Sequence, residues 1–417
     1  MGEWFGKDIA VELTGIAHGG FAVGRFDGRV VFVSDGIPGE TVVARVSDDS
    51  KASFWRADTV SVQNPSEHRV QNPWPEAGLD RDPGMRVGGA DFGHISLPHQ
   101  LELKKQVIRD ALGRFAKLPE EQVTLLLERV ESLPGDLENN GLGWRSRVKL
   151  HVSENGAVGP RARRSHEVIR VDSLPLASEG INQIAPLDQD YRGVESISVL
   201  SPSVGEPRLI IGKQSPTVIR ERVGTREFRV DDSGFWQIHN SAPLALSEAV
   251  KEAVDRELFD PTAYNLDLYG GVGLLAAALA EVGGTATRIT TVETNGRATE
   301  HAGENLSEWV GAFAETARVE KWLLDLNRRA TESERQRLRS ATVILDPPRV
   351  GAGRDVMNTL GALAPNQIIY VACDPVALSR DIEFANRFGY RPVKIKAIDL
   401  FPHTHHVEAV CLLVRES

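Results

Sequence analysis

The chain has 417 residues, of which 41% are hydrophobic and 25% are charged, a composition typical of a soluble globular protein with two or three domains. Its two cysteines are too few for a disulfide framework or an all-cysteine zinc site, and no apolar run reaches the roughly 20 residues of a membrane helix. The formal net charge of −10 excludes a uniformly basic surface, but a local basic patch is enough to bind phosphate. Because the first residues show neither a signal peptide nor a myristoylation pattern, we expect a cytoplasmic protein.

Residues 1–63 alternate apolar and polar side chains in short runs broken by glycine and aspartate. Within this segment, Asp27-Gly28 separates two apolar runs, which predicts a β-hairpin. A closed OB-like barrel of about five strands suits a segment this short and this rich in strands. A stretch rich in Pro and Gly follows at residues 64–95, and residues 98–118 then carry an apolar stripe at helical spacing.

Short strands return between about residues 126 and 230, where basic side chains gather on two of them. These side chains are Arg145, Arg147, Lys149, Arg161, Arg163 and Arg164. An isolated run of charges is usually a solvated sheet face, and that interpretation stays open here. Two basic strands close together in an acidic protein nevertheless favour a surface that binds phosphates along a nucleic-acid backbone.

From about residue 235 onward, strand-like and helix-like segments alternate. The apolar strands NLDLY, ITTVE, ATVIL and IIYVAC are separated by helical segments, and RPVKIKAIDL and HHVEAVCLLV complete the chain as two further strands. This alternation predicts an α/β fold, with an open, Rossmann-like, mostly parallel sheet, helices on both faces and an antiparallel addition.

A glycine-rich turn joins the first of these strands to its helix. The glycines Gly271 and Gly273 let backbone N–H groups approach a ligand at the positive end of the helix, and Glu293 ends the next strand, where a carboxylate can accept hydrogen bonds from ribose. The same pattern fits a dinucleotide fingerprint, so it does not separate S-adenosylmethionine from NAD.

Later strands end in residues that separate the two cofactors. Asp346 and Cys373 each follow a parallel strand, and such strand ends share one rim with the glycine-rich turn. Hydride transfer has no use for that pair, whereas methylation of pyrimidine C5 requires a cysteine to add to C6 and a base to remove the C5 proton. Glu408 is a candidate base, while Cys411 suits a buried core position.

Three histidines, His403, His405 and His406, stand just before Glu408. Because no cysteine or acidic ligands are assembled beside them in the sequence, we expect no metal site.

These residues lie in motifs that resemble the bacterial RNA uracil-C5 methyltransferases, specifically the members with an N-terminal TRAM domain that act on 23S ribosomal RNA. The resemblance covers essentially the whole chain. FWQIHNSAP, LDLYGGVG, VETN, LDPPR, VACDP and DLFPHTHHVE occur in the family's order, and GIAHGGFAVGRFDGRVVFVSDGIPGE resembles TRAM, an OB-like RNA-binding barrel. VACDP and FPHTHHVE carry most of the specificity, since LDLYGGVG also occurs in other nucleotide-binding proteins.

The resemblance implies a class I methyltransferase domain that binds S-adenosyl-L-methionine, with Cys373 as nucleophile and Glu408 as proton-abstracting base. It implies cofactor contacts from Gln237, Tyr269, Gly271, Gly273, Leu274, Glu293, Asp325 and Asp346. Leu274 stands where members of the family often have Asn, so a polar contact is lost there or is replaced by backbone.

Some relatives bind a 4Fe–4S cluster through four cysteines. The equivalent positions here are Asn72, Val87, Ala90 and Ser173. Since cluster ligation requires thiolates, we expect no iron–sulfur cluster.

The resulting expectation is a monomeric enzyme that methylates C5 of a specific uridine in RNA, most readily 23S ribosomal RNA. Its domains are residues 1–63 as the TRAM barrel, 64–96 with 126–234 as a β-rich RNA-facing domain, and 97–125 with 235–417 as the methyltransferase. Alternatives are methylation of uridine 54 of transfer RNA, an RNA cytosine-C5 methyltransferase, an NAD(P)-dependent oxidoreductase and a non-catalytic RNA-binding protein.

Overall fold

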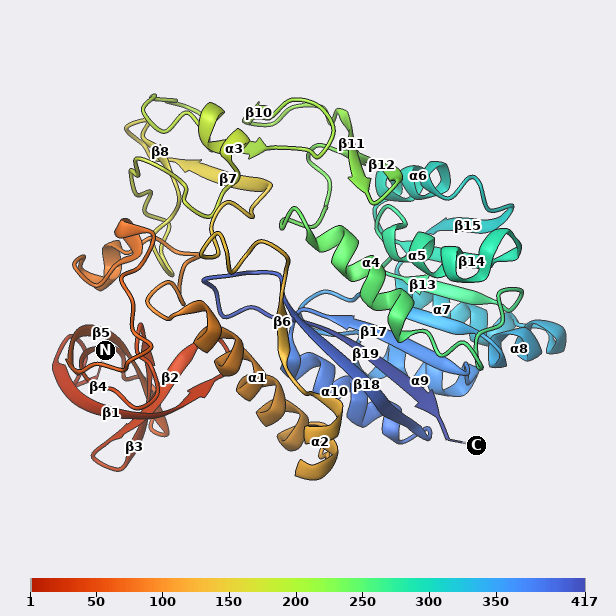
Figure 1. Ribbon diagram of the computed structural model, residues 1–417, viewed down its shortest axis with the longest axis horizontal. Coiled ribbons are helices and arrows are strands. Elements are labelled where there is room, and N and C mark those ends of the chain that lie inside the picture. The colour runs from red at the N-terminus through yellow and green to blue at the C-terminus, as the bar shows by residue number, and fades with distance from the viewer. Residues whose placement is uncertain (1, 417) are drawn as a thin grey trace.

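Residues 2–416 are described by the computed structural model, which consists of a small barrel, a central β-rich region and a large α/β unit (Figure 1). The large unit is built from two parts of the chain, because α1, α2 and β6 precede the central region in the sequence. The barrel forms one end of the molecule, and helix α1 runs between it and the large sheet (Figure 1). Within residues 2–416, no helix combines the length and apolar character needed to cross a membrane.

The N-terminal barrel confirms the predicted fold of this segment. Its strands are β1 (Asp8–Ala17), β2 (Phe21–Phe26), β3 (Arg29–Ser34), β4 (Thr41–Asp48) and β5 (Phe54–Asn64), closed in the order β1-β2-β3-β5-β4. Alternate residues of β1 and β4 point into a core that contains Val31 and Trp55. Asp27 and Gly28 both have positive φ, 48° and 76°, as the tight turn between β2 and β3 requires.

The central region is built around a four-stranded sheet in the order β10-β9-β7-β8. Its elements are β7 (Arg147–Val152), β8 (Val158–Gly159), α3 (Glu179–Ile184), β9 (Ser196–Leu200) and β10 (Arg208–Ile211). The linker from the barrel contains two short 3-10 turns, η1 (Pro75–Ala77) and η2 (Pro83–Met85). Buried ion pairs join the linker and the central region to the barrel, because Asp35 accepts from Arg86 at 2.8 Å and from Arg163 at 2.7 Å.

An eight-stranded sheet organises the large unit, in the order β15-β14-β13-β16-β17-β19-β18-β6. Its strands are β6 (Val130–Ser132), β13 (Asn265–Leu268), β14 (Arg288–Glu293), β15 (Gly311–Thr316), β16 (Thr342–Leu345), β17 (Gln367–Ala372), β18 (Tyr390–Asp399) and β19 (Glu408–Arg415). Strands β13 to β17 are parallel, and β19 is antiparallel to both β17 and β18. This confirms the predicted α/β class and its antiparallel addition.

Helices cover both faces of this sheet and give it two hydrophobic cores. They are α1 (Leu97–Arg114), α2 (Glu120–Leu126), α4 (Ala242–Ala253), α5 (Leu274–Gly283), η3 (Gly284–Ala286), α6 (Gly296–Asn305), α7 (Val319–Arg329), α8 (Glu332–Arg339), α9 (Gly353–Leu363) and α10 (Pro375–Asn386). Leu268 and Tyr370 pack into the core that contains α1 and α9, whereas Ile344 and Ile369 pack into the core on the other face. Burial on both faces explains why these strands are continuous apolar runs.

The large unit includes segments that the sequence analysis places in the central domain. Strand β6 pairs with β18 and so forms an edge of the eight-stranded sheet. The hairpin of β11 (Val218–Val223) and β12 (Arg226–Asp231) packs Phe228 and Val230 into the core beside α4 and α5. The pairing of β6 with β18 and the packing of this hairpin on α5 join residues far apart in the chain, which local sequence patterns do not report.

Candidate active site

The ends of the parallel strands bring three of the predicted residues to one rim of the sheet. Tyr269, Asp346 and Cys373 follow β13, β16 and β17, which are neighbours in the sheet. Glu408 opens β19, and the last paired residues of β17 and β19 are Ala372 and Ala409. One step further in this register, Cys373 stands opposite Glu408. Directly opposed residues of an antiparallel pair have Cβ atoms about 4.5–5.5 Å apart, so the register itself brings thiol and carboxyl together.

Burial, followed by the charges of neighbouring acidic groups, shifts the pKa values of the thiol and the carboxyl at this rim. Burial raises the pKa of the Cys373 thiol to about 12, with further increases from the charges of Glu408 and Asp346. Burial, followed by the charge of Asp346, raises the pKa of the Glu408 carboxyl well above its ordinary value. Arg349 acts in the opposite direction and lowers the pKa of both groups. A positive charge brought into this crevice would therefore favour both the thiolate and the carboxylate.

Asp346 and Asp267 form a second pair of interacting carboxyls at the same rim. Burial raises the pKa of each to about 7, and the charge of Asp267 adds to the shift of Asp346. Asp267 accepts a hydrogen bond from the Thr291 hydroxyl at 3.1 Å. Asp346 can thus exchange a proton near neutral pH, next to the cysteine.

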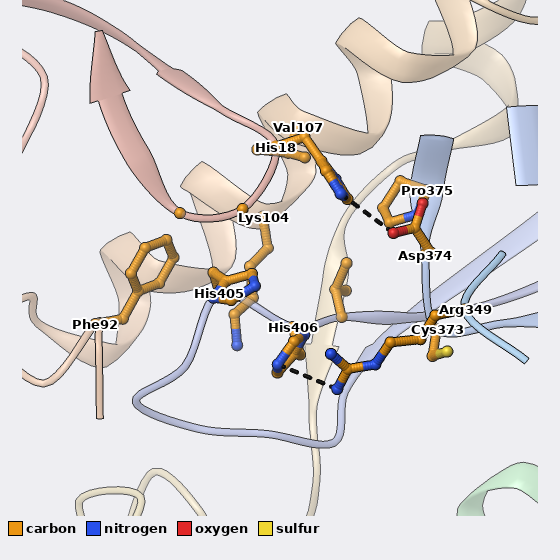
Figure 2. Close-up of a pocket in the computed structure, with 13 residues that line it drawn as sticks. His18, Phe92, Lys104, Val107, Arg349, Cys373, Asp374, Pro375, His405 and His406 are labelled. Carbon is orange, nitrogen blue, oxygen red and sulfur yellow. Dashed lines mark hydrogen bonds and ion pairs between the residues drawn. The ribbon is translucent and has the colours of Figure 1, made fainter. Parts of the chain in front are cut away.

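Cys373 lines a cavity of about 90 Å³ (Figure 2). Arg349 and His406 meet across it at 3.4 Å, and burial lowers the pKa of His406 to about 3, so this imidazole is neutral at physiological pH. His405 is hydrogen-bonded to Asp91 of the linker. No group of three or more His, Cys, Asp or Glu side chains that could hold a metal ion occurs in residues 2–416.

Helix α1 supplies two polar side chains that sequence reasoning missed. The Gln100 amide donates to the carbonyl of Ile95 at 2.8 Å and accepts from the N–H of His403 at 2.9 Å. Lys104 forms a buried ion pair of 2.6 Å with Asp399, at the end of β18. Together they fix the loop that leads to Glu408. The presence of a glutamine and a lysine on the apolar face of the predicted helix is the sequence feature that could have indicated these buried polar contacts.

The glycine-rich turn has the geometry of a nucleotide site. Gly271 and Gly273 have φ of 54° and 88°, and Gly273 is the N-cap of α5. A side chain at Gly270 would place its Cβ 1.9 Å from the Thr291 hydroxyl, so only glycine fits there. Glu293 accepts from the Gly271 N–H at 3.2 Å, which brings its carboxylate to the mouth of the turn. These residues fit a nucleoside-containing cofactor.

The remaining predicted cofactor residues, Gln237, Leu274 and Asp325, differ in burial and in their position relative to the rim. Gln237 is half-buried in the loop after β12, and Leu274 is the buried first residue of α5. Asp325 lies exposed in α7, six positions after the helix begins at Val319, or roughly 9 Å along its axis. The structure does not bring Asp325 to the rim. After burial, the largest cause that raises the pKa of Tyr269 is instead the charge of Glu320, in the first turn of α7.

A second cavity, of about 460 Å³, adjoins the one that holds the cysteine, since His405 and His406 line both. Its wall includes five of the six predicted RNA-binding residues, Arg145, Lys149, Arg161, Arg163 and Arg164. The basic side chains of the central region thus line a cavity that is adjacent to the one containing Cys373.

Three of the six predicted RNA-binding residues have carboxylate partners within the protein. Arg147 pairs with Glu221 at 3.4 Å, and Arg163 and Arg164 pair with Asp35 and Asp58 of the barrel. Burial beside Asp35 makes Arg163 a structural link between domains, which differs from the open phosphate-binding surface that the sequence suggested. Arg145, Lys149 and Arg161 form no ion pair with any residue of the described range 2–416.

The positions equivalent to cluster-binding cysteines lie mostly in one buried place. Asn72 accepts from the N–H of Trp74 at 2.9 Å and donates to the carbonyl of Ala90 at 3.5 Å. Val87 is buried in the same cluster, whereas Ser173 is exposed. The Asn72 side chain and the apolar side chains of Val87 and Ala90 therefore occupy the region where the cluster-binding relatives have cysteines.

Two family models match the chain. The TRAM domain model matches residues 5–57, and the model described as tRNA (Uracil-5-)-methyltransferase matches residues 263–416. A protein of Streptomyces avermitilis described as an uncharacterized RNA methyltransferase is 34% identical over 446 residues, covering 98% of each chain. A protein of Bifidobacterium longum with the same description is 33% identical over 430 residues, covering 97% of this chain and 96% of the relative.

One solved structure shares the fold over nearly the whole chain. The tRNA (uracil-54, C5)-methyltransferase of Pyrococcus abyssi, in complex with S-adenosyl-L-homocysteine, has a TM-score of 0.68 and 20% sequence identity, covering 97% of this chain and 99% of that one. With full-length relatives, both matched domains and this shared fold, the chain belongs to the TRAM-domain-containing family of RNA uracil-C5 methyltransferases.

Proposed function

We propose that this RNA methyltransferase methylates C5 of a uridine in 23S ribosomal RNA through a covalent adduct between Cys373 and C6 of the base. The observation that carries the proposal is the register between β17 and β19, in which Cys373 stands opposite Glu408. The reaction needs a nucleophile on one ring atom and a base at the next, which two adjacent side chains on paired strands can supply.

The chemistry divides between these two residues. The Cys373 thiol loses its proton and adds to C6, which makes C5 enolate-like. S-adenosylmethionine supplies the methyl group to C5 as an electrophile. Glu408, as carboxylate, then takes the proton from C5, the electron pair re-forms the C5–C6 double bond, and the sulfur leaves C6. Asp346, whose pKa is raised to about 7 by burial and by Asp267, is suited to accept the thiol proton.

On the cofactor side, we assign the ribose to Glu293 and the methionine part to Gln237, and we place Asp346 where the cofactor and the target base meet. The backbone of Gly271, Gly273 and Leu274 would cradle the cofactor at the N-terminus of α5, and Tyr269 would pack against it. Asp325 remains assigned by resemblance alone, because it lies exposed in α7.

The Glu293→Ala variant should bind S-adenosylhomocysteine at least about tenfold more weakly, since a hydrogen bond to a charged group is worth roughly 1.5–3 kcal/mol. Isothermal titration measures this directly. Glu300→Ala is the matched control, because Glu300 lies exposed on α6 and pairs only with Arg297. An unchanged dissociation constant in Glu293→Ala would place the cofactor elsewhere.

RNA is expected to reach the rim through the second cavity. Arg145, Lys149 and Arg161 are the cations there that remain for phosphates, and His405 and His406 separate this cavity from Cys373. A base inside a duplex is out of reach of the thiol, so the target uridine must lie in a loop or be flipped out.

Mass spectrometry of nucleosides from a strain that lacks the protein tests the function and the target together. We expect 5-methyluridine to disappear from one position of 23S ribosomal RNA, the target of the family members that the motifs of this chain resemble. Loss from transfer RNA would support the alternative target. Unchanged 5-methyluridine in both RNA classes would contradict the proposal.

A further inference from the structure

The turn between β1 and β2 of the barrel reaches the catalytic rim. His18, Gly19 and Gly20 line the same cavity as Cys373, although they lie more than 350 positions earlier in the chain (Figure 2). A domain that served only to add RNA affinity would have no reason to form part of this wall.

His18 contacts the residue that directly follows the nucleophile. Its Nε2 lies 3.1 Å from Asp374 Oδ2, and the other oxygen of this carboxylate accepts from the N–H groups of Val376 at 3.0 Å and Ala377 at 2.8 Å. One carboxylate therefore ties the barrel to the N-terminus of α10. Because Cys373 lies between β17 and this cap, movement of Asp374 moves the backbone that carries the thiol.

Gly20 makes the second contact of this turn. It has φ of 79°, and a Cβ at this position would lie 2.6 Å from the Cβ of His405 and 3.1 Å from the ring of Phe92. The barrel backbone thus packs directly against the loop that precedes Glu408. The barrel thus contacts Asp374, which directly follows Cys373, and His405, which lies three residues before Glu408.

We propose that the β1–β2 turn is a wall of the uridine cavity and that His18 is a positioning residue, which holds Cys373 in place through Asp374. This proposal rests on the proposed function for its catalytic consequence. With the turn docked, the thiol has a fixed position relative to the base and the cavity is closed on the barrel side, which excludes water. The barrel then contributes to the covalent step as well as to RNA affinity.

The catalytic test compares His18→Ala with His18→Gln, which keeps an N–H donor. Methyl transfer is measured with RNA from a strain lacking the protein. His18→Ala should lower kcat about fivefold, a modest loss because the His18–Asp374 contact is partly exposed, with KM for RNA changed less than twofold. His18→Gln should recover most of kcat. The control is Arg25→Ala, at the other end of β2, where Arg25 bonds only the carbonyl of Gly28.

A higher KM with unchanged kcat in His18→Ala would make the turn an RNA-affinity element and overturn the proposal. Hydrogen exchange of the free protein gives a readout that needs no activity. The amides of Val376 and Ala377 should exchange about fivefold faster in His18→Ala and at the wild-type rate in Arg25→Ala. Equal exchange in all three proteins would overturn the proposal that His18 holds Cys373 in place through Asp374. A wild-type protein that methylates no RNA would overturn only the proposed function.

Discussion

RNA that carries 5-fluorouridine at the target position should trap the protein as a covalent complex that survives denaturing gel electrophoresis. Cys373 adds to C6 and the methyl group is transferred to C5, but Glu408 then faces fluorine, which cannot leave as a cation. Elimination stops, and the protein stays linked to the RNA. The expected change is from no stable complex with ordinary uridine to near-complete capture at saturating cofactor.

Two cysteine variants make this experiment specific. Cys373→Ala should abolish the complex, whereas Cys411→Ala should still form it, because Cys411 is fully buried within β19 between β17 and β18. Peptide mapping of the adduct identifies the attached residue. Attachment at any residue other than Cys373, or the absence of an adduct during active turnover, would contradict the proposed mechanism.

Replacing Glu408 with Gln should produce a covalent complex even with ordinary uridine. Addition and methylation can still occur, but the amide cannot take the C5 proton, so the methylated adduct accumulates. Turnover should fall by about 10²–10⁴-fold, the range for loss of a positioned general base. The measurements are the steady-state rate and the fraction of enzyme linked to RNA after a single turnover.

The control for this variant is Glu131→Gln. Glu131 lies on β6, beside the same part of the sheet, and pairs with Lys396 outside the cavity. It should turn over at the wild-type rate. A Glu408→Gln protein that is slow but forms no adduct would assign Glu408 a role before the addition step and leave proton removal to another group.

The basic cluster of the central region shows where local patterns mislead. Arg161, Arg163 and Arg164 look equivalent in the sequence, yet Arg163 and Arg164 are bound to barrel carboxylates. Asp35 lies 128 positions before Arg163, and only the tertiary structure brings the two together. A charge reversal of all three arginines would therefore disturb domain docking as well as phosphate binding.

The sequence by itself missed β15, α7 and α8, but it determined the barrel, the alternation of strands and helices after residue 235 and the rim that carries Cys373. These follow from local rules, because apolar periodicity sets each element and the carboxyl ends of parallel strands share one edge. The tertiary structure alone decided what surrounds that rim, including Gln100 and Lys104 of α1, the edge strand β6 and the contact of His18 with Asp374. The partners of these residues are distant in the chain. Ion pairs and hydrogen bonds between such groups depend on three-dimensional packing, which produces no periodic pattern in the sequence.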